Sequence, residues 1–317
     1  MRRAVALLAI GLLVLAACAV PRERDDREPS RVAADASEVE AIFERYREVR
    51  NTAVELLDAK PLSTVESGPV LAIDSGSFEV AQRLSGTEEA DDAEVEISQV
   101  ATPSFGAYPL WFMAEVRDPE DEVNRVQVFE RASAVDPWLL VATPETVLTT
   151  ELPELRRRDG RAVVVAPDDD AGMTMSAQDA ADAYAEALAD PEADAVGLVE
   201  QDDFVEQMRE LVARNSALEG VEFSQSWAAE EVTHALRTAD GGALVFANLL
   251  RRDTFTVEEG VRVTWPEDSV QQAFLSSGIA TSGRLRYYHQ VLVHVPGGDA
   301  KPRVLGQYGG VVDGDGF

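Results

Sequence analysis

Residues 109–116 read Pro-Leu-Trp-Phe-Met-Ala-Glu-Val, a run that is apolar at both odd and even positions. A strand with apolar residues on both faces is buried on both sides, so this run predicts a central β-strand. Two more strands are predicted after it, over residues 123–131 and 138–142. Before it, residues 94–98 alternate between apolar and polar and predict a half-buried strand. The middle of the first half is therefore predicted to be a β-sheet.

An amphipathic helix is predicted before these strands. Apolar residues recur at spacings of three and four from Ser37 as far as Lys60-Pro61, and Ser37 with Glu40 has the spacing of a capping box. The stretch 62–84 is mixed. It predicts turns at residues 67–69 and 75–76 and short helical pieces that cover one side of the sheet.

The second half repeats this plan. Ser176 with Asp179 and Asp203 with Glu206 predict two helix starts, and Gly220 predicts the end of the second helix. Alternating or buried runs then predict strands over residues 221–227, 243–250, 261–265, 285–295 and 303–312, the last two joined as a hairpin around Gly297-Gly298.

This repetition predicts an α+β fold class with two tandem domains, each with one or more amphipathic helices packed on a curved antiparallel sheet. The first domain is predicted over residues 37–155 and the second over 176–317. A linker region over 156–175 separates them, because residues 156–160 form a charged turn and 167–172 an Asp-rich loop.

The N-terminus predicts export. A basic Met1–Arg3 is followed by an apolar run, Ala4–Leu15, which is shorter than the roughly 20 residues that a membrane-spanning helix needs. Leu15-Ala16-Ala17-Cys18 comes next and resembles the lipobox of bacterial lipoproteins. The resemblance implies a signal peptide over residues 1–17, signal peptidase recognition of Leu15, Ala16 and Ala17, and acylation of Cys18 with chains such as palmitate. The alternative is an ordinary secreted protein with an incidental cysteine.

Residues 18–36 are predicted to be a lipidated cysteine followed by a disordered tether, because charges of both signs alternate there without apolar periodicity. The predicted localisation is the outer face of the cell membrane. The anchor would then be the contact with the membrane, since a multiply acylated cysteine anchors stably.

The charge of the chain restricts its partners. It holds 58 acidic and 28 basic residues, a formal net charge of −30, and loss of Arg2 and Arg3 with the signal peptide would make it more acidic still. Such a field repels phosphate backbones, so no nucleic-acid partner is predicted. An unidentified surface protein or a small ligand remains open as a partner.

Three segments carry a family resemblance, namely residues 64–69, 108–114 and 138–141. With the lipobox, they resemble an uncharacterised actinobacterial lipoprotein family, a domain of unknown function that supplies no catalytic residues. Only Lys60 and Lys301 are lysine among the basic residues, which is typical of a high-GC genome. A looser likeness to tandem cystatin-like domains of the nuclear transport factor 2 type implies a cone-shaped sheet without deciding the function.

Histidine offers few candidate catalytic positions, since the chain has three. His289 shares a strand face with Leu285 and Val291 and is predicted to be either a core residue or a base lining a cavity. His294 is predicted on the opposite, solvated face, and His234 on an edge strand. No two of them have the spacing of a zinc site, so no metal site is predicted.

Other chemistry is also without a signal. The chain has no Gly-x-Ser-x-Gly motif, no phosphate-binding loop and no cysteine besides Cys18, so no catalytic residue and no cofactor are predicted. The acidic runs at 88–92, 168–170 and 313–315 are predicted to be solvated loops rather than calcium sites. The sequence thus favours a non-catalytic binding or scaffolding lipoprotein, and the alternative is a surface enzyme with His289 as its base.

Overall fold

The run at residues 109–116 forms the centre of the first half of a sheet. In the computed structural model, which describes residues 30–84, 96–117, 123–275 and 278–317, strand β4 (Leu110–Arg117) lies between β2 (Glu96–Ala101) and β5 (Val123–Arg131). Every residue from Leu110 to Ala114 is buried. The predicted central strand is confirmed, because both of its edges and both of its faces are covered.

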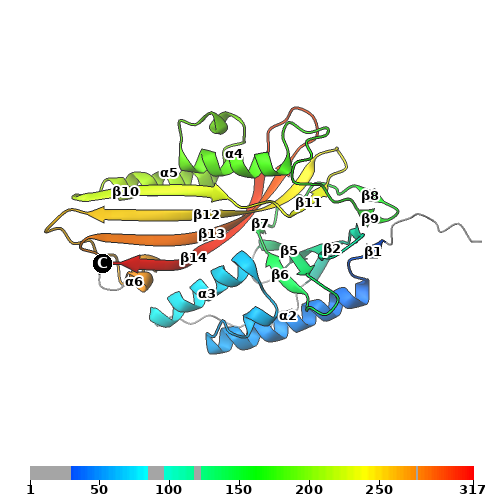
Figure 1. Cartoon of the computed structure of the whole chain (residues 1–317), viewed down its shortest axis with the longest axis horizontal. Helices are drawn as coiled ribbons and strands as arrows, with labels where there is room; N and C mark the ends of the chain where they lie inside the picture. Colours follow the sequence, from blue (N-terminus) through cyan, green and yellow to red (C-terminus); the bar gives the residue numbers. More distant parts are fainter. Residues whose placement is uncertain (1–29, 85–95, 118–122, 276–277) are drawn as a thin grey trace, which may run out of the picture. The chain divides into compact units, whose positions relative to one another are not determined.

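The sheet is antiparallel and curled (Figure 1). Among the described residues it has ten strands, in the order β10-β12-β13-β14-β7-β5-β4-β2, with β11 beside β12 and β6 beside β5. The strands not yet placed are β6 (Leu139–Ala142), β7 (Glu145–Val147), β10 (Val221–Ala229), β11 (His234–Arg237), β12 (Ala243–Val257), β13 (Ser282–Val295) and β14 (Arg303–Gly316). Two short pairs lie outside it: β1 (Arg31–Val32) with β3 (Ser104–Phe105), and β8 (Arg157–Arg158) with β9 (Arg161–Ala162). Together with the helices, this arrangement confirms the predicted α+β class.

The first helix, α2 (Ala36–Leu56), begins one residue after its cap at Asp35. The predicted cap at Ser37 is wrong, because the Asp35 carboxylate accepts the Glu38 N–H at 3.0 Å and the Ser37 hydroxyl donates to that same carboxylate. The helix ends before Lys60-Pro61, since Leu57 adopts a left-handed φ of 48°.

Helix α3 (Gly68–Arg83) runs through the predicted turn at residues 75–76, so that turn is wrong. Gly76 is buried inside the helix, and a Cβ there would lie 1.9 Å from the Val311 carbonyl oxygen of β14. The glycine therefore marks a close approach of helix to strand rather than a turn. A 3-10 turn, η2 (Leu62–Thr64), precedes α3.

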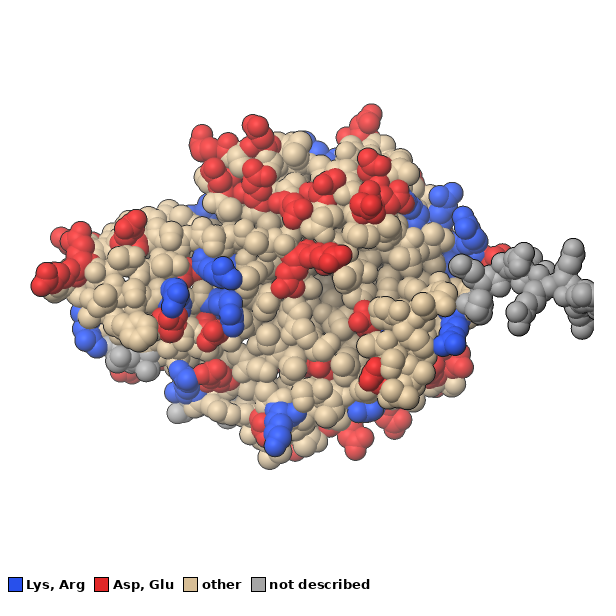
Figure 2. Space-filling view, in the orientation of Figure 1, with Lys and Arg blue, Asp and Glu red and all other residues tan. Residues whose placement is uncertain are grey.

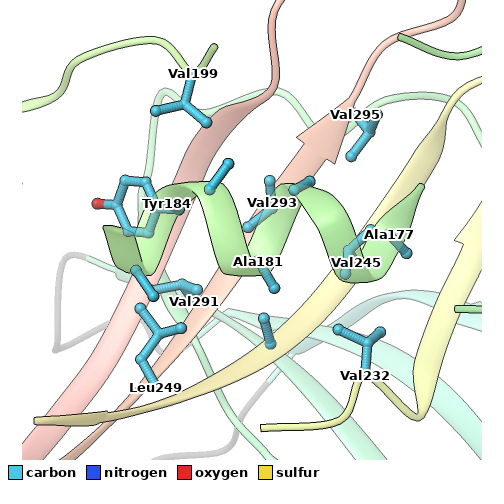
Figure 3. Close-up of a cluster of buried hydrophobic side chains, with 14 of the residues drawn as sticks. Ala177, Ala181, Tyr184, Val199, Val232, Val245, Leu249, Val291, Val293 and Val295 are labelled. Carbon is cyan, nitrogen blue, oxygen red and sulfur yellow. The ribbon is translucent and has the colours of Figure 1, made fainter. Parts of the chain in front are cut away.

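Helix α4 (Ala177–Ala189) has the predicted capping box between Ser176 and Asp179. Its small residues Ala177 and Ala181 and the ring of Tyr184 pack onto Val245, Leu249, Val291 and Val293 of β12 and β13 (Figure 3). The alanines allow a close approach of helix and sheet, and the Tyr184 hydroxyl donates to Asp202 at 2.8 Å. This face of the second half is therefore an apolar core.

The other helices are α5 (Asp203–Ser216), η3 (Asp194–Gly197) and α6 (Val270–Phe274). The cap of α5 is Asp202 instead of the predicted Asp203, because the Asp202 side chain accepts the Val205 N–H at 2.9 Å. The helix also ends four residues before Gly220. Within the part of the chain that the structure describes, no helix has the length and apolar character that a membrane crossing requires.

The predicted strand at residues 261–265 is wrong. Val263 makes one isolated β-bridge, to Ile279. Pro266 comes directly after this segment, and because proline has no N–H to donate, it cannot extend the pairing. Val263 nevertheless packs into a core cluster with Phe255 and Leu285. The apolar pattern of this segment therefore indicates that Val263 is buried, but it does not indicate that the segment pairs as a strand.

The two halves of the sheet meet where β14 pairs with β7, at Gln307 opposite Glu145. One core cluster contains buried residues of both halves. Trp111 and Val126 belong to the first half, and Leu236 and Leu292 belong to the second. Contacts group residues 31–317 into one compact unit.

The predicted linker region lies along β11. The Arg156 N–H donates to Arg237 O, the Val165 N–H donates to Ala235 O, and Ala162 and Val165 are buried. A division into domains at 156–175 remains a prediction.

Candidate functional site

A cavity of about 600 Å³ opens where the two halves of the sheet meet, and we call it the seam pocket. Its walls come from β4, β5 and β6 on one side of the join, from β11 and β12 on the other, and from the start of α3. The polar side chains in the lining include Ser67, Glu130, Thr233, His234 and Asn248. Segments distant in sequence thus supply one cavity of the size that binds small molecules.

A hydrogen-bonded chain of three side chains lies in this pocket. His234 Nε2 lies 2.8 Å from Glu130 Oε2, and His234 Nδ1 lies 2.9 Å from the Thr233 hydroxyl. The Trp111 ring meets the imidazole edge-on, with ring centroids 5.1 Å apart. Thr233 is exposed, His234 is buried and Glu130 is half-buried, so the imidazole is held between two side chains that are more exposed than itself.

Aromatic residues form much of the remaining wall. Phe105 packs on Trp111 with centroids 5.8 Å apart, and Phe246 lines the pocket from β12. Tyr108, which precedes a cis peptide bond to Pro109, carries the Arg31 guanidinium over its ring at 5.5 Å from the centroid. The wall therefore offers flat apolar surface beside the polar chain.

Gln290 of β13 holds the two sides of the seam together beneath the pocket. Its amide nitrogen donates to Val141 O at 2.8 Å and to Asn248 Oδ1 at 3.0 Å, and its oxygen accepts the Thr143 N–H at 3.0 Å. Gln290 is 1% exposed. A buried amide with these partners fixes β6 and β12, and with them Asn248, in register across the join.

The residue before Ser67 belongs to a second buried cluster. Tyr46 donates to Glu66 Oε1 at 3.1 Å, Tyr308 donates to Asp74, and Arg50 lies 3.8 Å from Asp74. Burial, together with the Asp74 charge, raises the pKa of Glu66 to about 9. Burial also raises the pKa values of Tyr46 and Tyr308 well above the ordinary range. Glu66 therefore binds its proton more tightly than an exposed glutamate does.

His289 lies in a different place, on the β13 face under α5. Its ring packs against Phe204, Trp227 and Tyr287, with centroids 5.2, 5.0 and 6.2 Å away, and it is 7% exposed. Neither ring nitrogen has a hydrogen-bond partner among the described residues. Burial lowers its pKa to about 3, assisted by the charge of Arg251. His289 is thus a neutral core residue, and this geometry does not support the alternative of a base in an open cavity.

The other histidines differ from their predictions in part. His294 was predicted to be solvated but is buried, because the loop that carries Asp240 lies against it, with His294 Nε2 3.8 Å from Asp240 Oδ2. Burial lowers the pKa of His294, and Asp240 opposes that shift. His234 lies on β11, which pairs with β12, while segment 154–165 bonds to its other edge.

The acidic runs are partly engaged in ion pairs. Asp313 and Asp315 are not in a loop but in β14, where they lie 3.1 Å from Arg286 and 2.7 Å from Arg284. Asp169 pairs with Arg237. Residues 88–92 and the predicted lipidation and signal peptidase residues Leu15, Ala16, Ala17 and Cys18 lie outside the described residues. No group of three or more possible metal ligands occurs in the described ranges.

Comparison with known proteins places the chain in a family. Residues 31–316 match the family described as Domain of unknown function (DUF8094). The chain belongs to this family. It is also 27% identical over 217 residues to an "Uncharacterized lipoprotein" of Streptomyces avermitilis, a match that covers 65% of this chain and 62% of that relative. No solved structure matches the chain.

These findings confirm the resemblance to an uncharacterised actinobacterial lipoprotein family. In this member of the DUF8094 family, all three segments that carried the resemblance, 64–69, 108–114 and 138–141, contribute residues to the seam pocket. Sequence reasoning did not join them to Glu130 or His234, because cross-strand neighbours from different halves leave no spacing signal. The gathering of aromatic residues around Trp111 was the available hint.

Proposed function

We propose that this protein is a membrane-anchored extracytoplasmic lipoprotein that binds a small ligand in the seam pocket without transforming it. The observation that carries the proposal is the cavity of about 600 Å³, lined by aromatic rings and a few convergent polar groups. The Leu15–Cys18 pattern and the name of the Streptomyces relative support the anchor. The Thr233 hydroxyl lies 2.9 Å from His234, which pairs with Glu130, and nucleophilic catalysis can use this order of groups, so the experiment below includes a search for product.

Ligand capture tests the pocket. The lipidated protein is purified from its native membranes and analysed by native mass spectrometry for small molecules that remain bound. Ala107 is exposed and lines the pocket, so Ala107→Trp should fill the space and abolish capture, whereas Ala107→Ser should retain it. Equal capture by both variants, or a product formed from the captured molecule on incubation, would contradict the proposal.

Metabolic labelling tests the anchor. Cys18→Ser should remove incorporation of a palmitate analogue and release the protein from the lipoprotein fraction, because no other cysteine can replace it. An exported Ser variant that still incorporates the label would exclude lipidation at Cys18.

A further inference from the structure

The Glu130 carboxylate has one oxygen engaged and one available. Oε2 pairs with His234 Nε2 at 2.8 Å, and no contact is found for Oε1 among the described residues. The Glu130 side chain is 26% exposed, and it lines the seam pocket. The Thr233 hydroxyl can donate to Nδ1 and the Nε2–H to Oε2, an arrangement that leaves Oε1 to accept from a ligand.

No positive side chain faces this carboxylate from the lining. The described residues that line the seam pocket include no lysine or arginine, and Glu130 is the one acidic residue among them; the Arg31 guanidinium lies outside the lining, over the Tyr108 ring. An anionic ligand would meet this carboxylate without a basic partner. A cation would meet a free carboxylate oxygen, and the net charge of −30 would attract it to the protein from a distance. Carboxylates also outnumber basic groups on the face shown in Figure 2.

The rings of the lining suit a cation that carries an apolar group. Phe105, Tyr108 and Trp111 lie in the same wall, and aromatic faces attract ammonium and guanidinium groups. The Arg31 guanidinium already lies over the Tyr108 ring. Since Arg31 already covers the Tyr108 ring, the rings left for a ligand in this wall are those of Phe105 and Trp111.

We propose that the ligand of the seam pocket is an organic cation, a protonated or quaternary amine with an apolar substituent. Its charged nitrogen lies at Glu130 Oε1, and its apolar part lies against Trp111 and Phe105. This inference rests on the proposed function, since it names the ligand chemistry of the same pocket. The N-terminus of α3, where Ser67 makes no side-chain cap, lies elsewhere in the lining and repels cations, which also favours the Glu130 end for the nitrogen.

Three probes of similar shape and different charge test the inference. Benzylamine, benzyl alcohol and benzoate are titrated into the mature chain, residues 18–317, and binding is followed by the shift of the Trp111 indole N–H signal in ¹H–¹⁵N spectra. Benzylamine should bind about tenfold more tightly than benzyl alcohol, because it adds a charged hydrogen bond and a cation–π contact, and benzoate should bind more weakly than both.

Two variants test whether the preference for a cation arises at Glu130. Glu130→Gln should weaken benzylamine binding about tenfold and leave benzyl alcohol binding unchanged, since only the charge is removed. Glu222→Gln makes the same charge change at an exposed position on β10 and should alter neither. If Glu130→Gln does not fold, the series on the unaltered chain decides by itself.

The outcomes separate this inference from the proposed function. If none of the three probes shifts the Trp111 signal, the inference of a cation with an apolar aromatic group fails, whereas the proposed function still depends on ligand capture by the Ala107 variants. If benzyl alcohol or benzoate binds as tightly as benzylamine, the pocket stands as a binding site and the cationic ligand is excluded.

Discussion

At the scale of single residues, the burial of Glu66 makes the stability of the folded chain depend on pH. Its pKa is about 9 in the folded chain against an ordinary value of 4.5, mainly because of burial. Between these values the folded state holds a proton that the unfolded state has released, so stability falls as pH rises from about 5 to 9. Glu66→Gln should flatten this dependence by about 1.4 kcal/mol per pH unit, the slope for one proton. Denaturant unfolding at pH 5, 7 and 9 measures it, and an unchanged slope would mean that Glu66 is ionised.

His289 predicts the opposite pH dependence. Its folded pKa of about 3 lies below the ordinary 6.5, so its stabilising contribution is complete above pH 6.5 and is lost as pH falls toward 3. Because neither nitrogen has a partner in the described part of the chain, His289→Phe should cost less than about 1.5 kcal/mol at pH 7 and should improve relative stability at pH 4.5. Thermal unfolding at both pH values tests this. A large loss at pH 7 would show that the nitrogens are bonded in solution.

At the scale of elements, the apolar periodicity of the sequence predicted which faces of the strands and helices are buried. It did not predict where two elements approach each other closely. The capping box of α4 and the core strand β4 follow from local sequence. Gly76 was predicted to be a turn residue because the group that requires a glycine there is far away in the sequence. That group is the Val311 carbonyl, 235 positions later, which leaves no room for a Cβ. The same limit hid the seam pocket, whose His234–Glu130 pair joins strands from the two halves.

Gly76→Ala tests the contact between α3 and β14. An added Cβ would overlap the Val311 carbonyl oxygen, so helix and strand must separate, at a cost of about 2 kcal/mol or more despite the better helix propensity of alanine. Gly197→Ala is the control, since nothing lies within 4 Å of a Cβ there. Urea unfolding of both variants gives the difference. Equal stabilities would mean that α3 does not pack this closely on β14.

At the scale of the whole molecule, the question is how two similar halves behave as one unit. Each half has helices on an antiparallel sheet, as the tandem prediction requires, yet they share one sheet and one core cluster. Among the described strands of the large sheet, the first half pairs with the second at Gln307 opposite Glu145. The buried amide of Gln290 adds two hydrogen bonds across the join, with Val141 and Thr143, to the His234–Glu130 and Tyr308–Asp74 pairs.

Gln290→Leu should uncouple the halves. The substitution keeps the volume but leaves the Thr143 N–H and the Val141 carbonyl without their partner, at a cost of about 2–4 kcal/mol concentrated at the seam. We expect the unaltered chain to unfold in one calorimetric transition and the variant in two. Trypsin should then cut the variant at the exposed Arg156–Arg158, once segment 154–165 is released from β11.

Gln99→Leu, a half-buried position on β2, is the control and should keep one transition. The two measurements distinguish the possible architectures. Two transitions with cleavage at residues 156–158 would support separate domains held by the seam. A single, lower transition in Gln290→Leu without cleavage there would contradict the domain division, since one cooperative core would then span residues 31–317. Because the seam pocket is built from both halves, two transitions would also require ligand binding to disappear with the first of them.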